Sequence, residues 1–117
     1  MKSIIEQLVE MYYKEEWWHK IIMPPDEAFD YHREHCEKGD IYTHVKDGVV
    51  LGYYERYFNG DICFLANLYV RGDLRRSKVT KELYKHFLDT MPPHINYIVG
   101  EKQKVGGKMQ KVKIRSS

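Results

Sequence analysis

The sequence predicts an α/β fold in which helices cover a mixed β-sheet, and three observations support this class. Apolar residues recur at helical spacing near the N-terminus and again over residues 79–87. Between these segments, residues 41–70 have the composition of three strands joined by two tight turns. A further apolar segment, 94–99, follows the later helix. Because a strand reached through a helix normally lies parallel to the strand before that helix, we expect one parallel pair in an otherwise antiparallel sheet.

Composition and charge limit the classes of protein to which the chain can belong. It has 117 residues, of which 43% are hydrophobic, and this suits a single domain over residues 1–117 with its own core. The formal net charge of +2 indicates no general nucleic-acid-binding character. Residues 1–40 carry five basic and ten acidic side chains, whereas residues 100–117 carry six basic and one acidic. The two ends therefore suit different partners, or they face one another.

The cysteines and the apolar segments indicate the compartment. Cys36 and Cys63 lie in unlike contexts and have no metal-ligand spacing. The sequence shows no secretory leader and no apolar run long enough to cross a bilayer. We therefore expect a reduced, cytoplasmic protein without a membrane partner.

The first helix begins at a capping box formed by Ser3 and Glu6. Apolar residues at helical spacing extend it to about Trp18. The bulky residues Trp17, Trp18 and His19 at its end are expected to pack in the core, because aromatic side chains mostly serve burial.

A second helix begins after Pro24 and Pro25, with acidic residues in its first turn, and runs to about Lys38. Gly39 follows as a left-handed cap. The residues expected on its inward stripe are Ala28, Phe29, His32 and Cys36. His32, His35 and Cys36 lack a convincing fourth ligand, so we expect packed or surface histidines and no metal site.

Three consecutive antiparallel strands follow. The predicted order is strand 41–46, a type I′ turn at Asp47-Gly48, strand 49–58, a turn at 59–61 and strand 62–70. Alternation places one set of side chains on the same face of the middle strand: Leu51, Tyr53, Glu55 and Tyr57. On the third strand it predicts two faces, one with Ile62, Phe64, Ala66 and Leu68 and the other with Cys63, Leu65, Asn67 and Tyr69. Both faces of the third strand are mostly apolar, which is typical of the central strand of a sheet covered on both sides. Polar Asn67 on this strand must find hydrogen-bond partners or face a cleft.

The stretch 67–88 combines the third strand, a basic turn and an amphipathic helix that buries Val79, Leu83 and Phe87. The start of this helix has unpaired N–H groups and a positive dipole end, so it is a natural anion-binding position. Pro92 and Pro93 stop the helix, and the strand 94–99 follows.

The spacing in this stretch resembles the acetyl-CoA-binding segment of the GCN5-related N-acetyltransferase (GNAT) family. Without gaps, like residues fall at Val70, Asp73, Leu74, Arg75, Val79, Lys81 and Leu83. The resemblance implies a GNAT-like fold that binds acetyl-CoA through Val70 and a phosphate loop consisting of Arg75, Arg76, Ser77, Lys78, Val79 and Thr80. Lys78 and Thr80 stand where the family has glycines, so side chains here alter the approach of the pyrophosphate to the main chain.

The resemblance also implies acyl transfer to an amine acceptor, either a small molecule or a protein. Such a reaction needs a base, and the nearby candidates are Glu55, Asp73 and the hydroxyl of Tyr69. Each also has a structural interpretation: Glu55 as a paired charge, Asp73 as a turn or helix-cap residue, and Tyr69 as a core residue. In the family the first two helices cover the acceptor, which gives Trp17 and Trp18 a second interpretation as a wall of the acceptor site.

The C-terminus is shorter than in the resembled family, which has a further helix and a strand pair after its fifth strand. Only residues 100–117 remain here, and the alternation of Lys111, Val112 and Lys113 predicts one final strand. The family's last helix often carries the tyrosine that protonates the CoA thiolate, and this role has no evident occupant here.

Two other functions stay open. One is a catalytically inactive GNAT-fold interaction protein, which would contact an acidic partner through the basic turn and the lysine-rich tail. A second copy of the chain, in a homo-oligomer, is another partner to be considered. In this respect the short chain resembles acetyltransferase-like proteins encoded by tailed bacteriophages, some of which are virion components. A nucleic-acid binder that stacks bases on residues 53–58 is the least favoured, because the acidic first forty residues repel phosphate.

Overall fold

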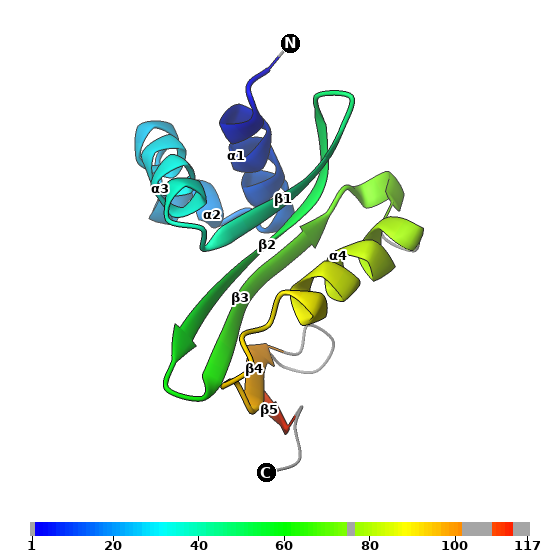
Figure 1. Cartoon of the computed structure of the whole chain (residues 1–117). Helices are drawn as coiled ribbons and strands as arrows, with labels where there is room; N and C mark the ends of the chain where they lie inside the picture. The colour runs from blue at the N-terminus through cyan, green and yellow to red at the C-terminus, as the bar shows by residue number, and fades with distance from the viewer. Residues whose placement is uncertain (1, 75–76, 102–108, 114–117) are drawn as a thin grey trace.

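Helices and strands follow one another along the chain in the order that the sequence predicts, with one short additional α-helix (Figure 1). The computed structural model describes residues 2–74, 77–101 and 109–113. The N-terminal helices are α1 (Ile4–Glu15), α2 (His19–Ile22) and α3 (Pro25–Glu37). Strands β1 (Ile41–Lys46), β2 (Val49–Asn59) and β3 (Ile62–Val70) lead through the 3-10 turn η1 (Gly72–Leu74) to α4 (Lys78–Asp89), β4 (Tyr97–Glu101) and β5 (Met109–Lys113).

The sheet has the predicted mixed topology. Its strand order is β1-β2-β3-β4-β5, and each neighbouring pair is antiparallel except β3 and β4, which are parallel. β4 begins at Tyr97 and not at His94 as expected, since His94 lies in a turn and the Tyr97 amide donates to the carbonyl of Asp61. The strand expected near the C-terminus is present as β5.

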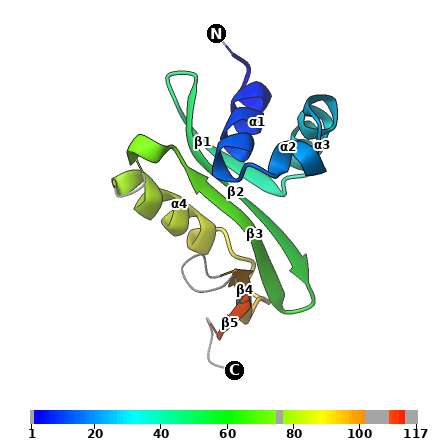
Figure 2. The same cartoon turned by 180° about the vertical axis from the view of Figure 1, so that it is seen from behind.

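Helices lie on both faces of the sheet (Figures 1 and 2). α4 packs on one face over a core formed by Tyr54, Cys63, Val70, Val79, Leu83, Phe87, Met91 and Ile95. The helices before β1 cover the opposite face, whose core is Leu8, Ile41, Val50, Tyr53 and Tyr69. Gly52 of β2 permits the close approach of α4, because a Cβ there would lie 2.7 Å from Leu83 Cδ1 and 2.8 Å from the carbonyl oxygen of Tyr69.

Irregularities in the strand register change which side chains share a face. Glu55 is opposite Asn67 and Arg56 is opposite Leu65, so Ala66 is an extra residue in β3. The strict alternation predicted for β3 is therefore wrong beyond Leu65. Asn67 and Tyr69 share the face of Phe64, and not that of Cys63 and Leu65. A similar shift at Leu51 of β2 places Val50 with Tyr53 in one core.

The N-terminal helices differ from the prediction at one end. α1 is capped by Ser3, whose Oγ accepts a hydrogen bond from the Glu6 amide, but the helix stops at Glu15 and not at Trp18. Trp17 is 76% exposed and Trp18 40% exposed, so the prediction that they pack in the core is wrong, whereas His19 is buried. These tryptophans lie in the turn between α1 and α2 and therefore follow no inward helical stripe.

The predicted turns are confirmed by the backbone angles. Asp47 and Gly48 have φ values of 51° and 78°, as a type I′ turn requires. Gly39 has a φ of 82° directly after α3, as expected for a left-handed cap.

Candidate active site

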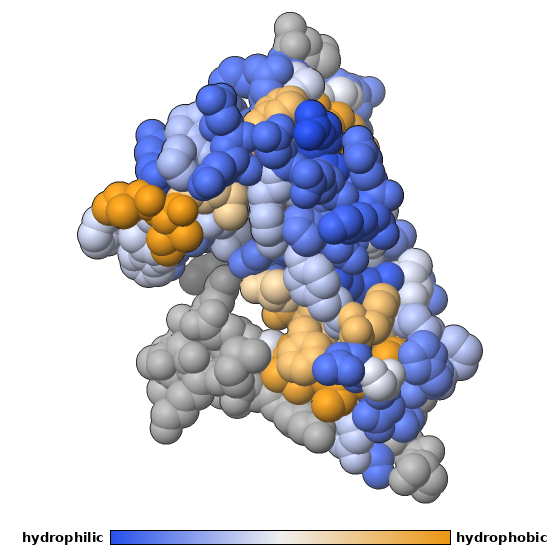
Figure 3. Space-filling model, turned by 90° about the vertical axis from the view of Figure 1, so that its left-hand side faces the viewer, coloured by the Kyte–Doolittle hydropathy of each residue, from blue (hydrophilic) through white to orange (hydrophobic). Residues whose placement is uncertain are grey.

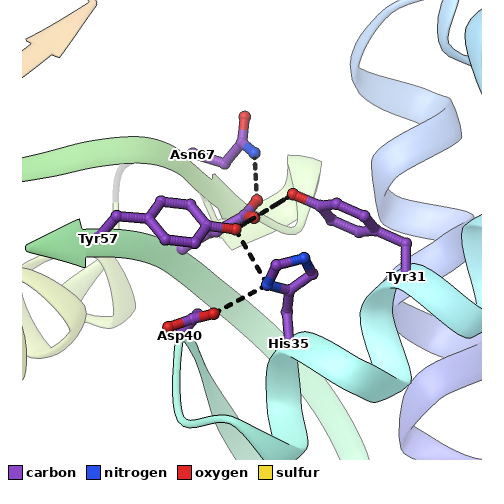
Figure 4. A network of polar contacts seen from close by, with 6 residues as sticks. Tyr31, His35, Asp40, Tyr57 and Asn67 are labelled. Carbon is purple, nitrogen blue, oxygen red and sulfur yellow. Dashed lines mark hydrogen bonds and ion pairs between the residues drawn. The ribbon is translucent and has the colours of Figure 1, made fainter.

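A buried carboxylate stands on β2, beneath the N-terminal helices. Glu55 is only 2% exposed, and both of its oxygens accept hydrogen bonds. Asn67 Nδ2 donates to Glu55 Oε1 over 2.7 Å, while the hydroxyls of Tyr31 and Tyr57 donate to Glu55 Oε2. The side chains come from α3, β2 and β3 and converge on one point (Figure 4). Three donors thus satisfy the oxygens of this buried carboxyl group.

A second layer of polar groups holds these donors in place. The Tyr69 hydroxyl donates to Asn67 Oδ1 over 2.8 Å, which fixes the amide so that its nitrogen points to Glu55. His35 Nδ1 lies 3.1 Å from the Tyr57 hydroxyl and 2.9 Å from Asp40 Oδ2. The network therefore reaches from the sheet to the loop between α3 and β1 (Figure 4).

The tyrosines of this network stay protonated at neutral pH. Burial raises the pKa of Tyr31 and of Tyr57 well above the ordinary value, and the hydrogen bond to Glu55 raises both further. The pKa of Tyr69 is also raised, first by burial and then by the charge of Glu15. These hydroxyls consequently act as neutral hydrogen-bond donors to acceptor groups in the network.

The structure brings together two of the three predicted catalytic residues. Glu55 and Tyr69 are linked through Asn67. Asp73 lies apart from this network on η1, where its carboxylate is 63% exposed and 3.3 Å from Arg71 Nη2.

Sequence reasoning missed four members of the network: Tyr31, His35, Asp40 and Tyr57. Two regular spacings carried a signal for three of them. Tyr57 follows Glu55 by two residues on one strand face, and Tyr31 and His35 are four residues apart on one helix face.

Beside this network lies the end of the described pairing between β3 and its parallel neighbour. Within the described residues, pairing joins Ile62–Leu65 of β3 to Tyr97–Gly100 of β4, and the extra residue Ala66 follows directly. The Val70 side chain is buried in the core beneath α4.

The predicted phosphate-binding residues lie at the start of α4. Ser77 is the N-cap, with its Oγ accepting from the Val79 amide over 3.2 Å and donating to the Leu74 carbonyl over 2.7 Å. The Val79 side chain is buried in the core, and Thr80 lies half-buried one position further along the helix. The Lys78 side chain is 87% exposed, with Nζ 3.9 Å from Glu82. Arg75 and Arg76 lie outside the described residues.

The described part of the chain shows neither a metal-binding cluster nor a membrane-spanning helix. No group of three or more His, Cys, Asp or Glu side chains there has a geometry that could hold a metal ion. No helix within residues 2–74, 77–101 and 109–113 combines the length and the apolar character needed to cross a membrane.

The sequence and the fold both resemble those of known proteins. The sequence model of the acetyltransferase (GNAT) family matches residues 5–102. The chain belongs to the GNAT family. A comparison with curated protein sequences gave no match.

Solved structures with the GNAT fold align over most of the chain. PaiA N-acetyltransferase from Thermoplasma acidophilum, in complex with coenzyme A, is 19% identical with a TM-score of 0.60, and the alignment covers 89% of this chain and 77% of that one. The aminoglycoside N-acetyltransferase AAC(6')-Iy, in complex with a CoA bisubstrate analogue, is 17% identical with a TM-score of 0.64, covering 86% and 74%.

The GNAT-like decarboxylase GphF, in complex with isobutyryl-CoA, is also similar. It is 14% identical with a TM-score of 0.62, and the alignment covers 83% of this chain and 60% of that one. At such low identities these likenesses show the fold alone. Since the fold includes a decarboxylase, membership of it does not by itself specify acyl transfer.

Within this GNAT fold, two features suit an acyl-CoA. The Asn67–Val70 part of β3 lies beyond the last described pairing with β4, at Leu65, and this is where the thioester would be held. The first turn of α4 opens on the chain that leaves β3, and its exposed Lys78 adds a cation to the helix dipole there. The glycines of the family pattern are absent, and the Ser77 hydroxyl already occupies the Val79 amide, so a pyrophosphate would depend more on side-chain cations here.

Proposed function

We propose that this chain is an N-acyltransferase that uses acetyl-CoA and acetylates an amine, either a small molecule or a protein side chain. One observation carries the proposal: Glu55 is paired across the sheet with Asn67, the first residue of β3 beyond the bulge that follows the last described pairing with β4. A hydrogen-bonded carboxylate thus lies beside the part of β3 where the thioester would be held. Acyl transfer needs this combination of a base and a place for the thioester.

Glu55 is proposed as the general base. An aliphatic amine is largely protonated at neutral pH, since its pKa is about 10.4, and it must lose a proton before its nitrogen can attack. Because Glu55 is only 2% exposed and both its oxygens have partners, the proton reaches it through a hydroxyl. Tyr31 takes a proton from the ammonium group and gives its own hydrogen to Glu55 Oε2. One N–H bond breaks, and one O–H bond forms on the carboxylate.

The other predicted residues hold the cofactor or shape its surroundings. Acetyl-CoA, when bound, supplies the thioester carbon that the amine attacks. The main chain near Tyr69 and Val70 would hold the thioester carbonyl, and the predicted phosphate loop 75–80, which includes the first turn of α4, would hold the pyrophosphate. Asp73, with its partner Arg71, orders the turn between these two parts.

Binding and turnover of acetyl-CoA test the proposal. A ligand that binds only the folded state at about 100 times its Kd stabilises it by about 2.7 kcal/mol, so acetyl-CoA should raise the melting temperature. Release of free thiol should then be measured over a panel of primary amines, in the wild type and in Glu55→Gln. The absence of a thermal shift at millimolar acetyl-CoA, together with no thiol release, would contradict the proposal.

An interaction protein that retains the fold is a second candidate, because a hydrophobic patch is exposed on the helical layer. We define this α2 patch by Trp17, Trp18, Ile21 and Ile22, whose exposed fractions are 76%, 40%, 72% and 64%. On the face shown in Figure 3, hydrophobic side chains form one group at the left edge beside a hydrophilic region and a second group lower on the same face. Exposed patches of this kind frequently mark protein contacts. Concentration-dependent association without acetyl-CoA binding, lost in an Ile21→Ser/Ile22→Ser variant, would favour this candidate.

A further inference from the structure

We propose that His35 and Asp40 are positioning residues for Glu55. They keep the Tyr57 hydroxyl oriented so that it donates its hydrogen to the Glu55 carboxylate. The inference rests on the proposed role of Glu55 as the base. Neither residue touches Glu55, and both act through Tyr57 (Figure 4).

The backbone explains why Asp40 lies beside His35. The amide of Gly39 donates to the Cys36 carbonyl over 3.1 Å, and the amide of Asp40 donates to the His35 carbonyl over 2.9 Å. These two bonds form a Schellman motif, which needs the left-handed φ of 82° that Gly39 adopts. The carbonyl of Asp40 also accepts from the Arg56 amide over 2.9 Å, which joins the motif to β2. Asp40 is thereby fixed both to the helix end and to the strand that carries Glu55 and Tyr57.

The geometry assigns the tautomer of His35. An ionised carboxylate only accepts hydrogen bonds, so Asp40 Oδ2 at 2.9 Å requires a hydrogen on His35 Nδ1. This nitrogen then has no lone pair for the Tyr57 hydroxyl 3.1 Å away, and toward Tyr57 it can only donate. The Tyr57 oxygen accepts, and its hydrogen is left to point at Glu55 Oε2. Asp40 therefore determines the direction of a hydrogen bond two groups away.

The consequence for Glu55 is a fixed set of donors. With Tyr57 held in this orientation, the carboxylate keeps one donor on Oε1 and two on Oε2, so that Tyr31 remains the hydroxyl able to exchange its hydrogen with an amine. If His35 Nδ1 lost its hydrogen, the Tyr57 hydroxyl would turn toward that nitrogen. Glu55 would lose a donor, and the position of its proton-accepting oxygen would be less well defined.

The direct test is the tautomer of His35 in Asp40→Asn. An asparagine amide at position 40 can donate to Nδ1, which would move the ring hydrogen to Nε2. We expect the ¹⁵N spectrum of the labelled protein, recorded without acetyl-CoA, to report the Nδ1–H tautomer in the wild type and the Nε2–H tautomer in Asp40→Asn. Asp30→Asn is the matched control, because Asp30 is an exposed carboxylate on the same helix, paired with Arg33 at 3.3 Å. It should leave the tautomer unchanged.

Kinetics provide the second readout. In Asp40→Asn we expect kcat to fall about tenfold while KM for the amine and for acetyl-CoA stays within about twofold, since only the alignment of the base is disturbed. In a Tyr57→Phe background the same substitution should have no further effect on kcat, because the connecting hydroxyl is gone. An unchanged tautomer, or an equal loss of kcat from Asp40→Asn with and without Tyr57, would overturn the inference. A tautomer change in a protein that acetylates no amine would instead contradict the proposed function and leave the positioning contact established.

Discussion

Asn67 Nδ2 donates a 2.7 Å hydrogen bond to Glu55 Oε1 across the β2–β3 pair. The contact exists because Ala66 is an extra residue in β3, which turns Asn67 from the face predicted by alternation to the face that carries Glu55. The same bulge directly follows the last pairing of β3 with β4. One inserted residue thus completes the carboxylate site at the end of the described β3–β4 pairing.

Replacing the carboxylate by an amide tests its role directly. In Glu55→Gln, the three donors that converge on position 55 would meet one oxygen and one NH₂ group, so a donor would face a donor. We expect kcat to fall by about 100-fold or more, as for loss of a general base, and the free energy of unfolding to fall by about 1–3 kcal/mol. Steady-state kinetics and urea denaturation measure the two effects.

Asp73→Asn is the control for this variant, because Asp73 is the other carboxylate that the sequence offers as a base. Its side chain is exposed and paired with Arg71, so kcat should change by less than about threefold. A larger loss of kcat in Asp73→Asn than in Glu55→Gln would mean that the base has been assigned to the wrong residue.

Gly39 links backbone conformation to the candidate site. Alanine at this position would be strained at a φ of 82° and would weaken the Schellman motif that holds Asp40 beside His35. We expect Gly39→Ala to lower the free energy of unfolding by about 1 kcal/mol and also to lower kcat. Denaturation and kinetics would be measured on the same preparation.

Gly60→Ala separates the two effects of the Gly39 variant. Gly60 also has a left-handed φ, of 60°, but it lies in the β2–β3 turn and takes no part in the Glu55 network. Its replacement should lower stability by a similar amount and leave kcat unchanged. Equal losses of kcat in both variants would indicate a general effect of lower stability.

Elements with strong local signals were predictable from the sequence. The strand boundaries 41–46 and 62–70 match β1 and β3, and Asp47-Gly48 and Gly39 adopt the predicted left-handed angles, because short-range sterics determine them. The parallel placement of β4 followed from the handedness of crossovers.

Features that depend on tertiary contacts were not predictable in the same way. The bulge at Ala66 has no local sequence signal, so the faces of Asn67 and Tyr69 were misassigned. Trp17 and Trp18 were expected in the core from their size alone, yet α1 ends before them. Glu55 was identified as a candidate base, but its partner Tyr31, and His35 behind Tyr57, come from a helix whose docking on the sheet no local pattern specifies.

Close packing of α4 on β2 predicts a cost for any side chain at position 52. In Gly52→Ala, the new Cβ would lie 2.7 Å from Leu83 Cδ1 and 2.8 Å from a main-chain oxygen of Tyr69 that cannot move freely. We expect the free energy of unfolding to fall by about 1–3 kcal/mol, as in other overpacked cores. Gly72→Ala is the matched control, since no atom lies within 4 Å of a Cβ there. If both variants were equally stable, α4 would lie further from β2 than the structure places it.

Burial of His32 predicts that the protein loses stability in mild acid. His32 is 2% exposed, with Nδ1 2.7 Å from the Ala28 carbonyl, and burial lowers its pKa below the ordinary 6.5 although that hydrogen bond opposes the shift. Above pH 6.5 the imidazole is neutral in both the folded and the unfolded chain, so its contribution is complete there. As the pH falls below 6.5 the unfolded chain takes up the proton first, and the free energy of unfolding decreases until the folded-state pKa is passed.

Urea denaturation between about pH 7.5 and 5.5 should therefore show a smaller decrease in the free energy of unfolding in His32→Gln than in the wild type. His86→Gln provides the comparison, because burial and the charge of Arg56 lower the pKa of His86 as well, and each variant should remove only part of the decrease. Equal slopes in the wild type and in His32→Gln would show that His32 is not held neutral in the folded protein.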